Sequence, residues 1–135
     1  MKLFVDTGAF IALADADDEN HKSAAAFYRN AREEGTRFVT TNFVICETSN
    51  YLRARISHRI AVLFLENLKK SGFIEIATVT PSVEDEAFTI LKRYADKDFS
   101  FTDCTSFSMM RSLKLKSAFA FDKHFEQFEG IRRLP

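Results

Sequence analysis

The chain has 135 residues, of which 46% are hydrophobic and 28% charged. This length and composition fit a single domain over residues 1–135 and exclude a disordered tail. Nineteen Lys and Arg balance nineteen Asp and Glu, so net charge gives no argument for nucleic-acid binding. The longest apolar runs are far shorter than a membrane span, and no signal-peptide core is present, so we expect a cytoplasmic protein with no membrane partner.

Strand and helix patterns alternate in the first half of the chain. Short β-rich runs predict strands over residues 3–5 and 37–41. Apolar side chains at helical spacing predict helices over residues 8–13, 21–34 and 43–55, and a further helix that Ser57 caps and Gly72 ends. We expect Gly35 to end the second helix and Asn42 to cap the third.

The second half continues the same alternation. Strands are predicted over residues 73–79, 118–121 and 131–134, and helices over 81–94 and 100–113. Residues 3–5 and 118–121 lack polar alternation, as strands buried on both faces do. The order predicts an α/β fold with a mainly parallel sheet that is covered on both faces.

Asp6 and Asp122 each follow a predicted apolar strand. In open α/β sheets, ligands bind outside the carboxyl ends of the strands, so both side chains are expected at one rim of the sheet. The alternative is that each aspartate caps the helix that follows it.

Glu47 and Asp103 are acids within predicted helices. Glu47 lies among Phe43, Val44, Tyr51 and Ala54 at helical spacing, so it is expected to face inward; the alternative is an edge position paired with an Arg. Asp103 is the last residue of a Ser100–Asp103 capping-box pattern, and it also shares a face with Phe107 and Met110.

Four acids at one rim would repel one another unless a positive charge lay between them. No Lys or Arg is an obvious partner in the sequence. Mg²⁺ or Mn²⁺ would supply that charge, because these ions take carboxylate, water and phosphate oxygens as ligands. The pattern therefore favours phosphoryl-transfer chemistry.

At this point the chain resembles the PIN-domain ribonucleases and, within them, the VapC-like toxins of toxin–antitoxin pairs. Four segments carry the resemblance in the order of the family: FVDTGAFIAL, TNFVICET, DKDFSFTDCTSFSMM, and AFAFDKHFEQF followed by GIRRL. The resemblance implies a Rossmann-like, three-layer α/β/α sandwich and a Mg²⁺- or Mn²⁺-dependent endoribonuclease. It also implies an RNA substrate, a small cognate antitoxin that blocks the activity, and a homodimer, with which a surplus of Phe at Phe27, Phe64 and Phe88 is compatible.

The resemblance assigns roles residue by residue. Asp6, Glu47 and Asp103 match the three principal metal-site acids of the family, and Asp122 matches the more variable fourth. Thr7, Asp98 and Ser100 match positions that help to order the site. The chain departs from the family pattern at Ala120, where many relatives carry a Thr that would orient Asp122.

Other candidates have simpler interpretations. Cys46 and Cys104 adjoin two of the acids in sequence, but neighbours on a helix point about 100° apart, so we interpret both as core residues. His124 is near enough to Asp122 to reach phosphate or metal, but a surface histidine is the favoured interpretation. Basic residues that can contact RNA are spread over several segments: Arg53, Arg55, Arg59, Lys69, Lys70, Lys92, Arg93, Lys114, Lys116 and Lys123.

Two other classes of protein compete with a nuclease. A phosphoaspartate enzyme of the haloacid-dehalogenase type needs a second Asp two residues after the first, and Gly8 stands there. The remaining alternative is a non-catalytic PIN-like module that binds RNA or protein. Such a module would show neither stabilisation by Mg²⁺ or Mn²⁺ nor an effect of acid-to-amide substitutions.

Overall fold

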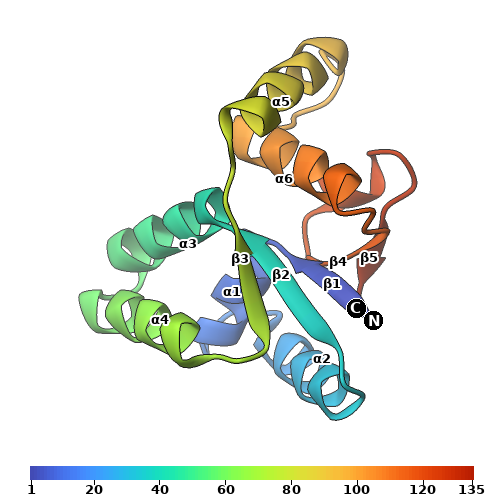
Figure 1. The fold of residues 1–135 in the computed structure, drawn as a ribbon. Helices are drawn as coiled ribbons and strands as arrows, with labels where there is room; N and C mark the ends of the chain where they lie inside the picture. Colours follow the sequence, from blue (N-terminus) through green and yellow to red (C-terminus); the bar gives the residue numbers. More distant parts are fainter.

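The computed structural model describes residues 1–135 as a five-stranded sheet flanked by six α-helices (Figure 1). In chain order the elements are β1 (Lys2–Val5), α1 (Thr7–Ala14), α2 (His21–Glu33), β2 (Arg37–Thr41), α3 (Asn42–Arg55), α4 (His58–Lys70), β3 (Ile74–Ala77), α5 (Pro81–Arg93), α6 (Phe101–Ser112), β4 (Ser117–Phe119), the 3₁₀ helix η1 (Lys123–Glu126) and β5 (Arg132–Leu134). Every predicted strand and α-helix is present, with ends shifted by a few residues. The 3₁₀ helix η1 was not predicted.

All five strands run parallel in the order β3-β2-β1-β4-β5. The pairing places Phe4 opposite Val39 on one side and Ala118 on the other, so β1 lies at the centre of the sheet. Because every strand points the same way, all carboxyl ends lie at one edge. The predicted α/β fold is confirmed, and the sheet is wholly rather than mainly parallel.

The helices form two layers on opposite faces of the sheet (Figure 1). Helices α1 to α4 belong to the crossovers that lead outward from β1 to β2 and β3, and they contact one another on one face. Helices α5 and α6 pack together on the other face, because their crossover returns from β3 to β4. This three-layer α/β/α arrangement follows from right-handed crossovers in opposite directions along the sheet.

Local sequence signals fix most helix starts. Ser57 accepts a hydrogen bond from the Ile60 backbone N–H (3.1 Å) and caps α4, as predicted. The α3 cap was placed one residue too late, because Thr41 accepts from the Val44 N–H (3.1 Å) and is the N-cap. Asn42 instead accepts a hydrogen bond from the Val79 N–H (2.8 Å), which ties the start of α3 to the segment after β3.

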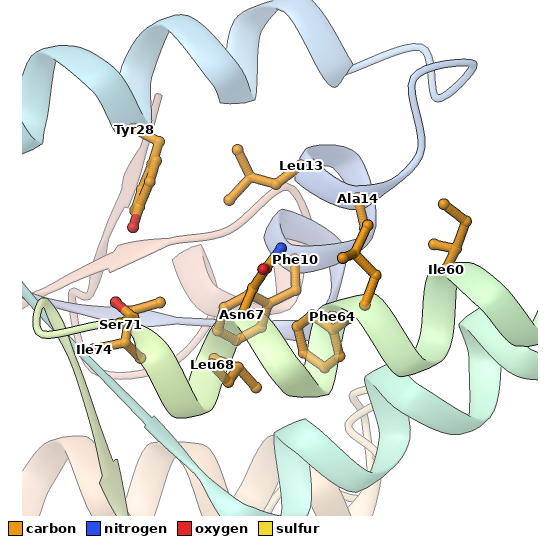
Figure 2. Close-up of a pocket in the computed structure, with 11 residues that line it drawn as sticks. Phe10, Leu13, Ala14, Tyr28, Ile60, Phe64, Asn67, Leu68, Ser71 and Ile74 are labelled. Carbon is orange, nitrogen blue, oxygen red and sulfur yellow. The ribbon is translucent and has the colours of Figure 1, made fainter.

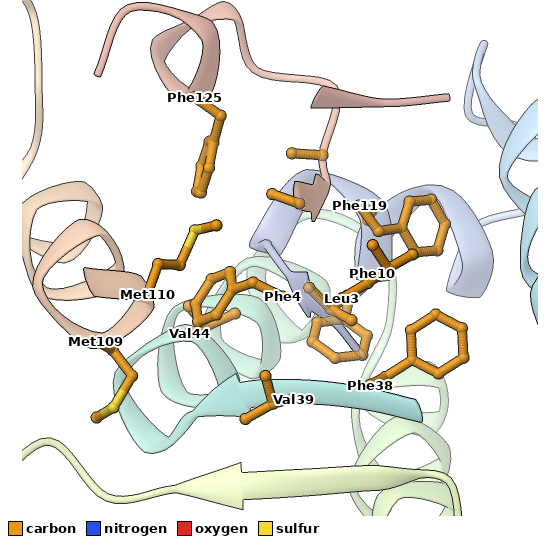
Figure 3. Close-up of a cluster of buried hydrophobic side chains, with 14 of the residues drawn as sticks. Leu3, Phe4, Phe10, Phe38, Val39, Val44, Met109, Met110, Phe119 and Phe125 are labelled. Carbon is orange, nitrogen blue, oxygen red and sulfur yellow. The ribbon is translucent and has the colours of Figure 1, made fainter. Parts of the chain in front are cut away.

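The core is rich in phenylalanine (Figure 3). Phe4 of the central strand stacks with Phe125 at 6.2 Å between ring centroids. Phe107 of α6 stacks on Phe128 at 4.6 Å and meets Phe125 edge-on at 5.2 Å. Both C-terminal rings are fully buried, so the segment after β4 is held against the sheet and α6 by aromatic packing.

Several predicted environments are corrected by the structure. Phe27 packs on Phe119 (4.8 Å) and Phe64 on Phe10 (5.3 Å), so only Phe88, 53% exposed, remains of the three rings that suggested a dimer surface. Cys46 is exposed rather than buried, because α3 turns Val44 and Thr48 inward instead. None of the helices combines the length and the apolar character needed to cross a membrane.

Candidate active site

Asp6 lies at the carboxyl end of the central strand β1, and 5% of it is exposed. Its backbone N–H donates to the Phe119 carbonyl (3.1 Å), which extends the pairing of β1 with β4 as far as the site. Although Asp6 occupies the N-cap position of α1, its side chain makes no capping hydrogen bond. Helix capping therefore does not explain why a carboxyl group is buried here.

Asp122 follows β4, the neighbour of β1 in the sheet, and it does act as a cap. Its Oδ1 accepts a hydrogen bond from the His124 backbone N–H (2.9 Å) at the start of η1. Its Oδ2 lies 3.2 Å from His124 Nδ1. The two alternatives for Asp122, cap and site residue, are thus compatible because each uses a different oxygen.

Asp103 is held by the predicted capping box at the start of α6. Ser100 Oγ accepts from the Asp103 N–H (3.0 Å), and Asp103 Oδ2 accepts from the Ser100 N–H (3.0 Å). The residue is only 8% exposed. The capping box therefore fixes the direction of a carboxyl group that is largely removed from water.

Glu47 lies on the exposed side of α3, and the prediction that it faces inward is wrong. The buried residues of α3 are Val44, Thr48 and Leu52. They are spaced four residues apart and form the inner face of the helix. Tyr51, which was used to place Glu47 inside, is 43% exposed. Glu47 makes no ion pair with an Arg either, but its charge still reaches Asp6, so it lies at the rim of the acid cluster.

The four acids act on one another electrostatically. Burial raises the pKa of Asp6 to about 8; the Thr7 backbone N–H opposes this rise, and the charges of Asp103, Glu47 and Asp122 add to it. Burial also raises the pKa of Asp103, with Asp122 raising it further and Ser100 and His124 opposing. Such shifts show that the site concentrates negative charge where water does not screen it.

His124 contacts two of these acids, and the favoured interpretation as a surface histidine is wrong. Its side chain is 18% exposed, and Nδ1 lies 3.0 Å from Asp103 Oδ2 and 3.2 Å from Asp122 Oδ2. The sequence spacing from Asp122 gave a weak signal for this position. What sequence could not show was that η1 turns the ring toward α6.

The positions expected to order the site differ in their surroundings. Thr7 is buried and its Oγ1 has no hydrogen-bond partner. Ser100 supports Asp103 directly, whereas Asp98 is exposed and makes no hydrogen bond or ion pair. Ala120 is buried and offers no hydroxyl to Asp122, whose oxygens are engaged by His124 instead.

A hollow of about 380 Å³ lies elsewhere, between α1, α2 and α4 (Figure 2). Nine of its eleven lining residues are hydrophobic, among them Phe10, Leu13 and Phe64. None of the four acids lines it. The hollow is therefore separate from the acids at the carboxyl edge of the sheet.

A divalent cation fits the donor set at that edge. Asp103, Asp122 and His124 offer ligand atoms that all lie within 4.8 Å of one another. Neither Lys nor Arg forms an ion pair with any of the four acids. The unpartnered Thr7 hydroxyl beside Asp6 adds a free oxygen donor. Carboxylates in excess of cationic side chains are the usual surroundings of Mg²⁺ or Mn²⁺.

The fold and this site together define a Rossmann-like α/β protein with an acidic centre at the carboxyl edge of a parallel sheet. The family profile of the PIN domain matches residues 3–131, and the chain belongs to the PIN-domain family. It is 33% identical over 123 residues to the 23S rRNA-specific endonuclease VapC20 of Mycobacterium tuberculosis, an alignment that covers 91% of each chain. It is also 32% identical over 127 residues to a VapC ribonuclease of Archaeoglobus fulgidus, covering 93% of this chain and 80% of that one.

Solved structures agree with this assignment. The crystal structure of M. tuberculosis VapC20, described as a sarcin–ricin loop cleaving toxin, superposes with a TM-score of 0.86 at 32% identity, covering 96% of this chain and 98% of that one. VapBC2 of Rickettsia felis, bound to a DNA fragment from its promoter, gives a TM-score of 0.71 at 12% identity, covering 98% and 97%, and supports the fold alone. The predicted resemblance to PIN-domain ribonucleases and VapC-like toxins is confirmed.

Proposed function

We propose that this chain is a metal-dependent endoribonuclease that hydrolyses RNA phosphodiester bonds and acts as the toxin of a toxin–antitoxin pair. The observation that carries the proposal is Asp6, a buried carboxyl group without a cap role, whose pKa the charges of three other acids help to raise. The names of the relatives support the reaction class, since both are ribonucleases of the VapC type. Asp6, Glu47, Asp103 and Asp122 are the proposed catalytic and metal-binding residues.

When bound at the acids, Mg²⁺ or Mn²⁺ would supply the positive charge that phosphodiester hydrolysis needs at the scissile phosphate. The residues of the chain then have distinct tasks. Asp103, which the capping box orients, presents a carboxylate from α6, and the buried Asp6 presents one from the end of β1. Glu47, on the exposed side of α3, is placed at the rim, where an RNA strand would enter.

The RNA itself would be held by basic residues outside the acid cluster. All ten basic residues considered as RNA contacts are exposed. Arg53 and Arg55 lie in the last turn of α3, the helix that carries Glu47, and Lys123 is next to Asp122. We expect these exposed cations to bind backbone phosphates of the RNA, with salt-dependent affinity.

Cleavage of purified total RNA tests the reaction class. The protein, freed of any partner, is incubated with RNA in Mn²⁺, in Mg²⁺ and in EDTA, and Asp6→Asn is prepared in the same way. Discrete cleavage with metal, and none in EDTA or with Asp6→Asn, is expected. Mapping the 5′ ends by primer extension then shows whether ribosomal RNA is the substrate, as the name of VapC20 suggests for that relative. Cleavage that is unchanged in EDTA would contradict the metal-dependent mechanism.

The partners are proposed on the basis of family membership. We expect a small antitoxin to bind this chain and block cleavage, and we expect the chain to form a homodimer in the cytoplasm. Co-expression with a candidate small antitoxin, followed by purification through a tag on one chain and light scattering, tests both expectations. A lone monomer whose activity the small protein leaves unchanged would contradict them.

A further inference from the structure

The imidazole of His124 lies between carboxyl groups that come from two different elements. Nδ1 is 3.0 Å from Asp103 Oδ2 in α6 and 3.2 Å from Asp122 Oδ2 after β4. The other histidines have unrelated surroundings: His21 Nδ1 contacts the Ala12 carbonyl (2.7 Å), and His58 is exposed at the start of α4. His124 is therefore the one imidazole of this chain that the fold directs into the acid cluster.

Several contacts fix the position of this ring. The His124 backbone N–H donates to Asp122 Oδ1 (2.9 Å), and the ring meets Phe99 edge-on at 5.6 Å. The next residue, Phe125, is fully buried between Phe4 and Phe107 and anchors η1. A side chain supported in this way keeps its direction when a ligand arrives, so little conformational entropy is lost on binding.

The distances from His124 Nδ1 to the two carboxylate oxygens suit ligands of one ion. Oxygen ligands lie about 2.0–2.1 Å from Mg²⁺ in an octahedral site, so neighbouring ligand atoms are about 3.0 Å apart. Both distances from Nδ1, 3.0 and 3.2 Å, match that spacing. The same distances suit a ring N–H shared between two carboxylates, so a test must distinguish coordination from hydrogen bonding.

We propose that His124 is a nitrogen ligand of the divalent ion, together with Asp103 and Asp122. This inference rests on the proposed function, because it takes the acid cluster as the metal site. Imidazole is a poor ligand for Mg²⁺ and a good one for first-row transition ions. His124 therefore shifts the selectivity of the site from Mg²⁺ toward Mn²⁺ and later transition ions, which an all-carboxylate site would not do.

Pulsed EPR of bound Mn²⁺ detects a coordinated nitrogen directly. Full-length protein is labelled with ¹⁵N-histidine, loaded with Mn²⁺, and measured by electron spin-echo envelope modulation. We expect a ¹⁵N coupling in the wild type and in His58→Gln, the control for an exposed histidine, and no coupling in His124→Gln. A wild-type spectrum without ¹⁵N coupling overturns the proposal whether or not the variant folds, and His124→Gln identifies the histidine when a coupling is present.

Mn²⁺ titrations supply the second readout. His124→Gln is expected to bind Mn²⁺ at least about tenfold more weakly, because even residues that only support a ligand contribute about 10–100-fold to metal affinity, with a smaller change for Mg²⁺ measured by competition. Asp103→Asn shows whether the counted Mn²⁺ is the ion at the acids. Mn²⁺ at that position without ¹⁵N coupling overturns this inference and leaves the nuclease intact, whereas no Mn²⁺ binding together with cleavage in EDTA overturns both.

Discussion

The two ends of α6 carry opposite charges in opposite surroundings. At its start, Asp103 is buried within reach of the charges of Asp6 and Asp122, and no Lys or Arg pairs with it. In its last turn, Arg111 is 41% exposed and pairs with Glu86 (2.6 Å) and with Glu129. Both charges suit the helix dipole, but only the second end is balanced by its neighbours. At the first end no Lys or Arg pairs with the acids, and burial together with the neighbouring charges raises the pKa of Asp6 to about 8, so a proton or a bound cation can offset the excess of negative charge.

The largest effect is expected when one acid of the cluster near the start of α6 is removed. Asp6→Asn removes one carboxylate, and we expect RNA cleavage to fall by at least about a hundredfold, because a group that acts on developing charge contributes on that scale. Single-turnover cleavage of the mapped RNA measures it. Asp85→Asn, which changes an exposed acid of α5, is the matched control and should cleave normally.

The same unbalanced charge predicts an unusual pH dependence of stability without metal. The pKa of Asp6 is about 8 in the folded protein against 3.8 for an ordinary Asp, so the folded state holds a proton that the unfolded state releases between these values. The free energy of unfolding therefore falls as pH rises from about 4 to 8, by up to about 1.4 kcal/mol per pH unit for one proton. Urea unfolding in EDTA at several pH values measures the slope.

Two changes should remove this slope. Asp6→Asn, which lacks the titrating group, is expected to be more stable than the wild type at pH 8 and similar to it at pH 4. Mn²⁺ at pH 8 is expected to stabilise the wild type more than Asp6→Asn, which lacks one of the proposed ligands. A wild-type stability that rises with pH in EDTA would show that the carboxyl group of Asp6 is not kept protonated by its surroundings.

Some features of the fold and the site can be predicted from local sequence patterns, whereas others depend on tertiary packing. The order of elements, the parallel sheet and the Ser100 capping box follow from local patterns, and all are present in the structure. The direction of Glu47 and the position of His124 depend on which helix face packs inward and on the turn of η1. Both depend on tertiary packing. Helical periodicity therefore placed Glu47 inside, and the usual surface position of histidine gave the wrong interpretation of His124.

A substitution of Ser100 distinguishes the contribution of the capping box to helix stability from its contribution to RNA cleavage. Ser100→Ala removes the side-chain cap of α6, and we expect a loss of about 1 kcal/mol in unfolding free energy. Asp103 Oδ2 accepts its bond from the backbone N–H of residue 100, which alanine retains, so cleavage at a temperature where the variant is folded should change little. A loss of cleavage as large as that of Asp6→Asn would mean that the Ser100 hydroxyl itself acts in the reaction.

The smallest effect is expected at the C-terminal end of α6, where Arg111 is paired with two glutamates. Burial alone would lower the pKa of Arg111, but Glu129 and Glu86 raise it above its ordinary value, and the guanidinium lies 5.4 Å from the centre of the Phe128 ring. Arg111→Met keeps an apolar stem over that ring and removes two half-exposed ion pairs, which contribute about 1 kcal/mol or less. Urea unfolding at low and high salt measures the loss, which should shrink as salt screens the pairs, while RNA cleavage stays at the wild-type rate. If Arg111→Met instead lost cleavage, the charge of Arg111 at the end of α6 would be needed for the function of the acids at its start. The two ends of the helix would then be electrostatically coupled.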